Sequence, residues 1–297
     1  MSSSSHAVQL RGALLVVIGS LCWSIGGVLS RLLTTDPMTT AFWRALSAAL
    51  FMFIWLLATR RGALWRDFRT AGWAGLLAAA CWAYASASFV FALQYTTVAT
   101  ISVIQSIGPF VAALLAYVLM GEKLRGRTWI AMAIALVGVI VMMARAPRGA
   151  DLTGTLIAFG MASVFAGAVV IMRYHREIRM TLAACMGAAI SAVVTAPFAD
   201  IGGTPVADMP YLLAFGILQL GVGLIFFTNG APRVPAAQAT LLATVEPIAA
   251  PFWVWIGFRE YPGIWVLAGG ALVLAALIGH ALLDLRESRR FEPPRQP

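Results

Sequence analysis

The chain has 297 residues, of which 61% are apolar and 11% are charged, whereas about a quarter of the residues in a soluble domain are charged. This composition excludes a water-soluble fold and predicts a membrane protein. The formal net charge of +9 does not indicate a nucleic-acid partner, because the basic residues lie in short runs between apolar stretches and not on one amphipathic face.

Apolar stretches recur along the whole chain. A helix needs about 20 apolar residues to cross a hydrocarbon core of roughly 30 Å, and ten stretches approach or exceed that length. We therefore expect an all-α polytopic membrane protein with ten transmembrane helices and no soluble domain. The expected spans are residues 12–33, 37–59, 70–93, 98–119, 128–144, 154–172, 180–199, 211–228, 236–256 and 263–283.

The distribution of arginine indicates an orientation, because cytoplasmic loops carry the excess of basic residues. If the N-terminus is cytoplasmic, only Arg31, Arg145, Arg148 and Arg259 fall on the outer side, and most of the other basic residues fall on the inner side. We expect a multi-pass protein of the bacterial cytoplasmic (inner) membrane. Both terminal tails, residues 1–11 and 284–297, are predicted to be cytoplasmic.

An internal repeat links the two halves of the chain. When 99–122 is placed over 237–260, Pro109 superposes on Pro247 and Glu122 on Glu260. Each half, 12–144 and 154–283, then holds five spans joined by a linker at 145–153. Because five is odd, the second half must cross the membrane in the opposite sense. Inverted repeats of this kind are typical of secondary transporters, with the substrate near the midplane between the halves.

The amino-acid sequences of these segments also resemble those of a known family. "ALQYTTVATISVIQSIGPFVAALLAYVLMGEKL" and "LLATVEPIAAPFWVWIGFREYPGIWVLAGGALVL" resemble the EamA-type transporters of the drug/metabolite transporter (DMT) superfamily, and most resemble the bacterial aromatic amino acid exporter branch, often called YddG. The resemblance implies ten helices, cytoplasmic termini and outward movement of amino acids and related metabolites through a central cavity. The second repeat departs from the pattern, since "GFRE" replaces the usual "GE".

Two charged residues are candidates for a charge deep inside the membrane, where it costs about 2.5–3.5 kcal/mol. Glu246 lies near mid-depth and is followed by Pro247, so it could bind a proton or a substrate ammonium group; alternatively, it is a neutral glutamate bonded to an adjacent helix. Arg44 could bind a substrate carboxylate through its two-pronged donors, or it could brace the helices by bonding their carbonyl groups.

Further candidates come from polar and aromatic residues within the spans. The hydroxyl pairs could line a cavity or act as interhelical contacts, and the aromatic residues could form an apolar pocket or face lipid. The two prolines are expected to act as hinges. In addition to Glu246 and Arg44, the substrate-binding candidates are Ser102, Ser106, Thr240, Thr244, Gln105, Gln219, Trp23, Trp82, Tyr84, Phe89, Phe226 and Phe227. The expected hinges are Pro109 and Pro247.

The sequence therefore predicts a secondary transporter that exports amino acids, including aromatic and other hydrophobic ones, by alternating access. The alternative is an exporter or importer of drugs or other small metabolites. An intramembrane enzyme is disfavoured because the histidines are scattered and one buried carboxylate stands alone, and a channel because no continuous polar stripe is evident. No cofactor, metal or nucleic acid is expected. The expected partners are amino acid substrates, membrane lipids and, if transport is coupled to protons, protons. The protein is expected to be a monomer or a weak homodimer.

Overall fold

The computed structural model describes residues 3–60, 62–121, 124, 126–144, 152–175, 177–234, 239 and 242–290. Helices connected by short turns make up this part of the chain, and no strand occurs in it. The first half contains α1 (Ser3–Ser24), α2 (Gly26–Leu32), α3 (Pro37–Thr59), α4 (Leu64–Tyr95), α5 (Val98–Ser106), α6 (Gly108–Met120) and α7 (Gly126–Ala144).

The second half follows the same order with more interruptions. Its elements are α8 (Leu152–Tyr174), α9 (Met180–Thr195), η1 (Ala196–Phe198), η2 (Val206–Asp208), α10 (Met209–Ala214), η3 (Phe215–Val222), α11 (Gly223–Gly230), η4 (Ala231–Arg233), α13 (Val245–Phe258) and α14 (Ile264–Arg290). η3 is a π-helix, and η1, η2 and η4 are 3₁₀ turns.

Eight helical stretches of the described chain are long and apolar enough to cross a membrane. Two shorter apolar helices, Gly126–Val141 and Val245–Phe258, lie where the fifth and ninth spans were predicted. Apart from a few end residues and the breaks described below, all ten predicted segments are helical where they are described, and the chain is a multi-pass membrane protein. The third predicted span differs at its start, because α4 begins at Leu64 and bends at Gly72. The φ of Gly72 is 52°, a positive value that glycine adopts without strain.

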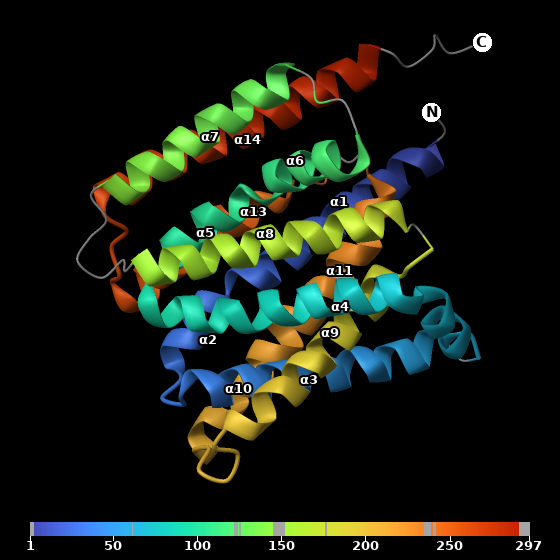
Figure 1. The fold of residues 1–297 in the computed structure, drawn as a ribbon, viewed down its shortest axis with the longest axis vertical. Coiled ribbons are helices and arrows are strands. Elements are labelled where there is room, and N and C mark those ends of the chain that lie inside the picture. The colour runs from blue at the N-terminus through green and yellow to red at the C-terminus, as the bar shows by residue number, and fades with distance from the viewer. Residues whose placement is uncertain are drawn as a thin grey trace.

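Helix pairs from the two halves pack reciprocally (Figure 1). α1 packs on α11 while α8 packs on α4, so the first span of each half contacts the third span of the other. α3 packs on α9, α5 on α13 and α7 on α14. Each remaining span thus meets its own counterpart, which is the pattern expected of two repeats related by a pseudo-two-fold axis.

Three spans are interrupted near their middle. The first breaks at Ile25 between α1 and α2, the fourth at Ile107 between α5 and α6, and the ninth at Thr244 before α13. Pro109 lies in the first turn of α6, where its missing N–H is not needed. Interrupted helices expose backbone polar groups, which suits them to line a binding site between repeats.

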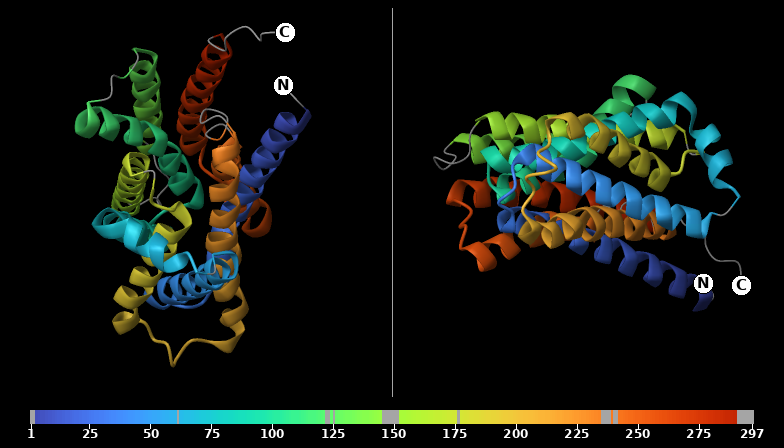
Figure 2. Two further views of the ribbon diagram at one scale, coloured as in Figure 1. Left: turned by 90° about the vertical axis from the view of Figure 1, so that its right-hand side faces the viewer. Right: turned by 90° about the horizontal axis from the view of Figure 1, so that it is seen from below.

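The described ends of the chain, Ser3 and Arg290, lie at the same end of the helix bundle (Figures 1 and 2). The α3–α4 turn lies at this end, where Asp67 accepts from Arg60 at 3.2 Å and from Arg179 at 3.0 Å. The turn that joins α2 to α3 lies at the opposite end. There Asp36 caps α3 by accepting from the N–H groups of Met38 and Thr39.

Candidate functional site

Arg44 is the buried charge around which the central polar site is built. It lies on α3, two turns after the Asp36 cap, and is 4% exposed. Its Nη1 donates to the Ser86 carbonyl oxygen at 3.1 Å and to Ser86 Oγ at 2.9 Å. Its Nε and Nη2 donate to Gln219 Oε1 at 3.3 and 3.0 Å. The guanidinium therefore bridges α4 of the first half and η3 of the second.

Two aromatic rings cover the Arg44 guanidinium. Its central carbon lies 5.2 Å from the centre of the Phe89 ring and 4.8 Å from that of Phe215. Such cation–π contacts stabilise a desolvated cation by about 2 kcal/mol. We call Arg44, Ser86, Phe89, Phe215 and Gln219 the Arg44 cluster.

Gln219 is positioned by the π-helical segment η3. π-Turns are rare and frequent at functional sites, and this one places Phe215 and Gln219 together toward Arg44. The Gln219 amide also donates to the Trp23 carbonyl oxygen at 3.3 Å. A side chain on Gly26 would meet Gln219 and Phe89 at 3.2–3.3 Å, so the α1–α2 break closes tightly over the cluster.

The partners of Arg44 in the described chain are neutral. The ion pairs that this part of the structure shows are Arg31–Glu260, Arg60–Asp67, Arg179–Asp67 and His175–Glu177, none of which involves Arg44. A buried cation with neutral partners keeps an uncompensated charge, and guanidinium geometry matches a carboxylate through two parallel bonds. A carboxylate that replaced Ser86 or Gln219 on the guanidinium would compensate this charge.

A second polar contact joins the two interrupted helices α5 and α13. Gln105 Nε2 donates to Glu246 Oε1 at 3.2 Å. Of the hydroxyl candidates, Ser106 donates within its own helix to the carbonyl oxygens of Ser102 and Val103, and Thr244 is buried at the break before α13. Thr240 lies outside the described residues.

The aromatic candidates separate into different environments. Trp23 packs on Phe227 with ring centres 4.9 Å apart, and Trp82 packs on Phe165 at 4.8 Å. Trp82 is buried, and its Nε1 has no hydrogen-bond partner among the described residues. Trp82 also borders a small hollow with Ser86 of the Arg44 cluster.

Three of the remaining candidates lie in more open positions. Tyr84 is 50% exposed, Phe226 is half-buried, and Pro109 is exposed. The structure thus brings Trp23, Arg44, Phe89 and Gln219 together and joins Gln105 to Glu246, whereas Tyr84 is half exposed and takes no part in either group.

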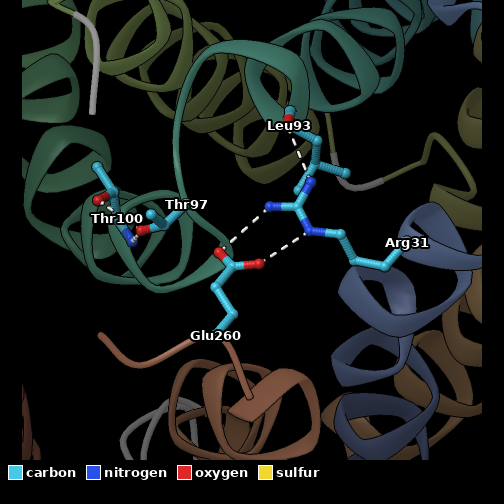
Figure 3. A network of polar contacts seen from close by, with 5 residues as sticks. All are labelled: Arg31, Leu93, Thr97, Thr100 and Glu260. Carbon is cyan, nitrogen blue, oxygen red and sulfur yellow. Dashed lines mark hydrogen bonds and ion pairs between the residues drawn. The ribbon is translucent and has the colours of Figure 1, made fainter. Parts of the chain in front are cut away.

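A further polar network lies where α2 ends, at the end of the bundle opposite the termini (Figure 1), and Figure 3 shows it from close by. Arg31 Nε donates to Glu260 Oε2 at 2.9 Å and Nη2 donates to Oε1 at 3.2 Å, while Nη1 reaches the Leu93 carbonyl oxygen at 3.4 Å. Nearby, the Thr97 hydroxyl caps α5 by accepting from the Thr100 N–H. The Arg31–Glu260 pair joins the first half of the chain to the second.

Sequence reasoning missed Ser86, Phe215 and the Arg31–Glu260 pair. The repeat carries a signal for the pair: Arg31 lies one residue before the end of α2, Arg173 lies one residue before the end of α8, and Glu260 superposes on Glu122. The same two residue types thus recur at equivalent positions, although Glu122 and the side chain of Arg173 lie outside the described part. Ser86 and Phe215 carry no comparable signal.

The fold and the buried polar site define a helical multi-pass membrane protein whose halves share a polar centre. The sequence profile of the EamA-like transporter family matches the chain twice, over residues 10–144 and 152–281. The chain belongs to this family of DMT-superfamily transporters.

Relatives of the chain are also described as transporters. An uncharacterized transporter of Bacillus subtilis, YwfM, is 27% identical over 286 residues, or 90% of this chain and 92% of the relative. An uncharacterized transporter of Archaeoglobus fulgidus is 28% identical over 65% of this chain and 70% of the relative. A crystal structure of another protein, 19% identical, matches 99% of this chain and all of its own with a TM-score of 0.60, which indicates a shared fold.

Proposed function

We propose that the protein is a secondary transporter that exports amino acids, including aromatic and other hydrophobic ones, across the cytoplasmic membrane. The observation that carries this proposal is Arg44, a buried cation with neutral partners between two aromatic rings. The guanidinium binds the substrate carboxylate, and the rings of Phe89 and Phe215 contact its apolar part.

Glu246 provides the second charged group. It comes from the opposite half and is held by Gln105 of the first half. Its carboxylate binds either the substrate ammonium group or a coupled proton. In the first case, the two halves supply groups of opposite charge for a zwitterion. The energy source is the substrate gradient or the proton motive force.

Alternating access follows from the two halves moving relative to one another. The reciprocal packing of α1 on α11 and α8 on α4 supports an inverted repeat, and the breaks at Ile107 and Thr244 supply flexible points beside Pro109 and Pro247. Both termini are cytoplasmic in this proposal, which agrees with the excess of arginine on their side.

A drug or another small-metabolite anion is the second candidate substrate. The Arg44 cluster favours an anion with an apolar body, and nothing in its five residues requires an ammonium group. Comparing an amino acid with its N-acetyl derivative, which keeps the carboxylate and loses the ammonium charge, separates the two candidates.

The experiment is uptake of radiolabelled amino acids into proteoliposomes that contain the purified protein. We expect saturable uptake of a large apolar amino acid, weak uptake of its amide, and loss of uptake by about a hundredfold in Arg44→Gln, since the proposed charge pair with the substrate carboxylate can no longer form. Arg44→Lys should retain part of the activity, because lysine keeps the charge without the two-pronged geometry.

The matched control is Arg69→Gln, which removes an exposed arginine from α4. It should transport as the parent protein does. Thermal unfolding in detergent checks that the Arg44 variants fold. Equal uptake of the acid and its amide by the parent protein would contradict the proposal.

A further inference from the structure

We propose that Arg31 and Glu260 form a second binding site for a zwitterionic amino acid, at the end of the bundle opposite the termini. The inference rests on the proposed function, because it takes the transported molecule to be an amino acid. The site is separate from the Arg44 cluster: its side chains come from α2 and from the turn after α13.

The geometry of the pair is that of a carboxylate in a guanidinium fork. Two nearly parallel bonds, 2.9 and 3.2 Å long, join Arg31 to the two carboxylate oxygens of Glu260 (Figure 3). A substrate carboxylate has the same shape as the Glu260 head group and can take its place on Arg31. The Glu260 carboxylate released in this way can accept from a substrate ammonium group.

The pair connects the two halves where they must separate for the substrate to leave. Arg31 is also tied to the Leu93 carbonyl oxygen at the end of α4. When this end of the bundle opens, Arg31 and Glu260 move apart, and each loses its counter-charge. The side chains are 29% and 26% exposed, so water reaches them but solvates them incompletely.

A zwitterion compensates both charges at once. Its carboxylate pairs with Arg31 and its ammonium group with Glu260, so one ion pair is exchanged for two and no partly buried charge stays unpaired. An amino acid amide lacks the carboxylate, and an N-acetyl amino acid lacks the ammonium charge. Either compound leaves one of the two side chains without a partner.

The contacts of Asp208 at this end offer no such exchange. Asp208 accepts from the N–H groups of Thr34 and Thr35 at 2.8 and 2.9 Å and from the Thr34 hydroxyl at 2.9 Å. These donors are neutral and held by the backbone, so a zwitterion gains no charge pairing by displacing them. Unlike the Asp208 contacts, the Arg31–Glu260 pair is a contact that a zwitterion can replace with two ion pairs of its own.

Accessibility supports a site that is reached from this end. Glu260 borders a small hollow together with Thr97, Pro251, Val254 and Pro262. The hollow is small, and proline and valine side chains line it beside the Glu260 carboxylate.

The test measures competition separately at the two faces of the membrane. Spheroplasts expose the outer face and inside-out vesicles the inner face, and the competitors are phenylalanine, phenylalanine amide and N-acetylphenylalanine. In the parent protein, phenylalanine should compete about tenfold better than either derivative at both faces. In the double variant Arg31→Gln/Glu260→Gln, this discrimination should fall at the outer face to what the Arg44 cluster alone provides and stay unchanged at the inner face.

A charge-exchanged variant, Arg31→Glu/Glu260→Arg, restores the ion pair across the two halves and controls for a merely structural role. If the pair only holds the bundle closed, the neutral variant raises flux for all three compounds alike and keeps the discrimination at the outer face, and the inference is overturned. If the parent protein showed no discrimination at either face, that result would instead contradict the proposed function itself, so the two failures are distinguishable.

Discussion

Arg259 adopts the same left-handed backbone conformation at the end of α13 that Gly121 adopts at the end of α6. The φ angles are 54° and 67°. The two residues are equivalent in the internal repeat, each directly preceding the glutamate of its half. The replacement of "GE" by "RE" therefore leaves the helix end unchanged, and the turn still directs Glu260 toward Arg31.

This relationship predicts that Arg259→Gly stabilises the protein. A residue with a Cβ in the left-handed region costs about 1 kcal/mol relative to glycine, so we expect a gain of about 0.5–1 kcal/mol in the free energy of unfolding. Thermal unfolding in detergent measures it. The control is Arg69→Gly in the exposed part of α4, which should destabilise the protein because glycine disfavours a helix.

Much of the fold is predictable from the sequence because lipid leaves few choices. A helix satisfies its own backbone hydrogen bonds, so each apolar run of sufficient length becomes a helix. The π-helical turn at Phe215–Val222 was not predictable, because apolar residues surround it and no periodicity marks it. The contacts of Arg44 with Ser86 and Gln219 depend on this turn and on packing between distant helices.

Helical periodicity alone could have separated two of the aromatic candidates. Trp82 and Tyr84 are two positions apart on α4, which places them about 200° apart around the helix axis. Both cannot face the same cavity, and the structure buries Trp82 and exposes Tyr84. The exact position of a helix break is harder to predict from a proline. The break between α5 and α6 falls at Ile107, two residues before Pro109, because proline disturbs the turn that precedes it.

Glu246→Gln should abolish any dependence of flux on pH. Glutamine has the size of glutamate and can still bond Gln105, but it cannot bind or release a proton. Flux into proteoliposomes with and without a pH gradient measures the effect. Glu177→Gln, which removes a carboxylate near the start of α9 whose side chain is 52% exposed, is the control and should leave the response unchanged. A pH response that persists in Glu246→Gln removes this residue from proton coupling.

The topology proposal predicts which face each end of the bundle occupies. An epitope tag fused after Pro297 should bind antibody only after the cells are permeabilised. A cysteine introduced at Gly202, in the exposed turn at the opposite end, should react with an impermeant maleimide in intact cells. The native cysteines at 22, 81 and 185 are partly or fully buried, so the parent protein supplies the background. Antibody binding to intact cells would reverse the orientation.

Trp82→Ala should weaken transport of large apolar amino acids more than that of small ones. Trp82 borders the hollow beside Ser86, and truncating a buried aromatic side chain removes contact area that only a large substrate uses. The expected result is a rise in the KM for tryptophan or phenylalanine with a smaller change for alanine. Tyr84→Ala, on the exposed face of the same helix, should change neither.

Trp82→Phe distinguishes a binding role from packing. Phenylalanine keeps most of the contact with Phe165 and therefore preserves the fold, but it lacks the indole N–H that has no partner in the described chain. If that N–H bonds the substrate, Trp82→Phe raises the KM without lowering the unfolding temperature. Equal losses of transport for large and small amino acids in Trp82→Ala, accompanied by a lower unfolding temperature, would show that Trp82 only packs α4 against α8 and α9.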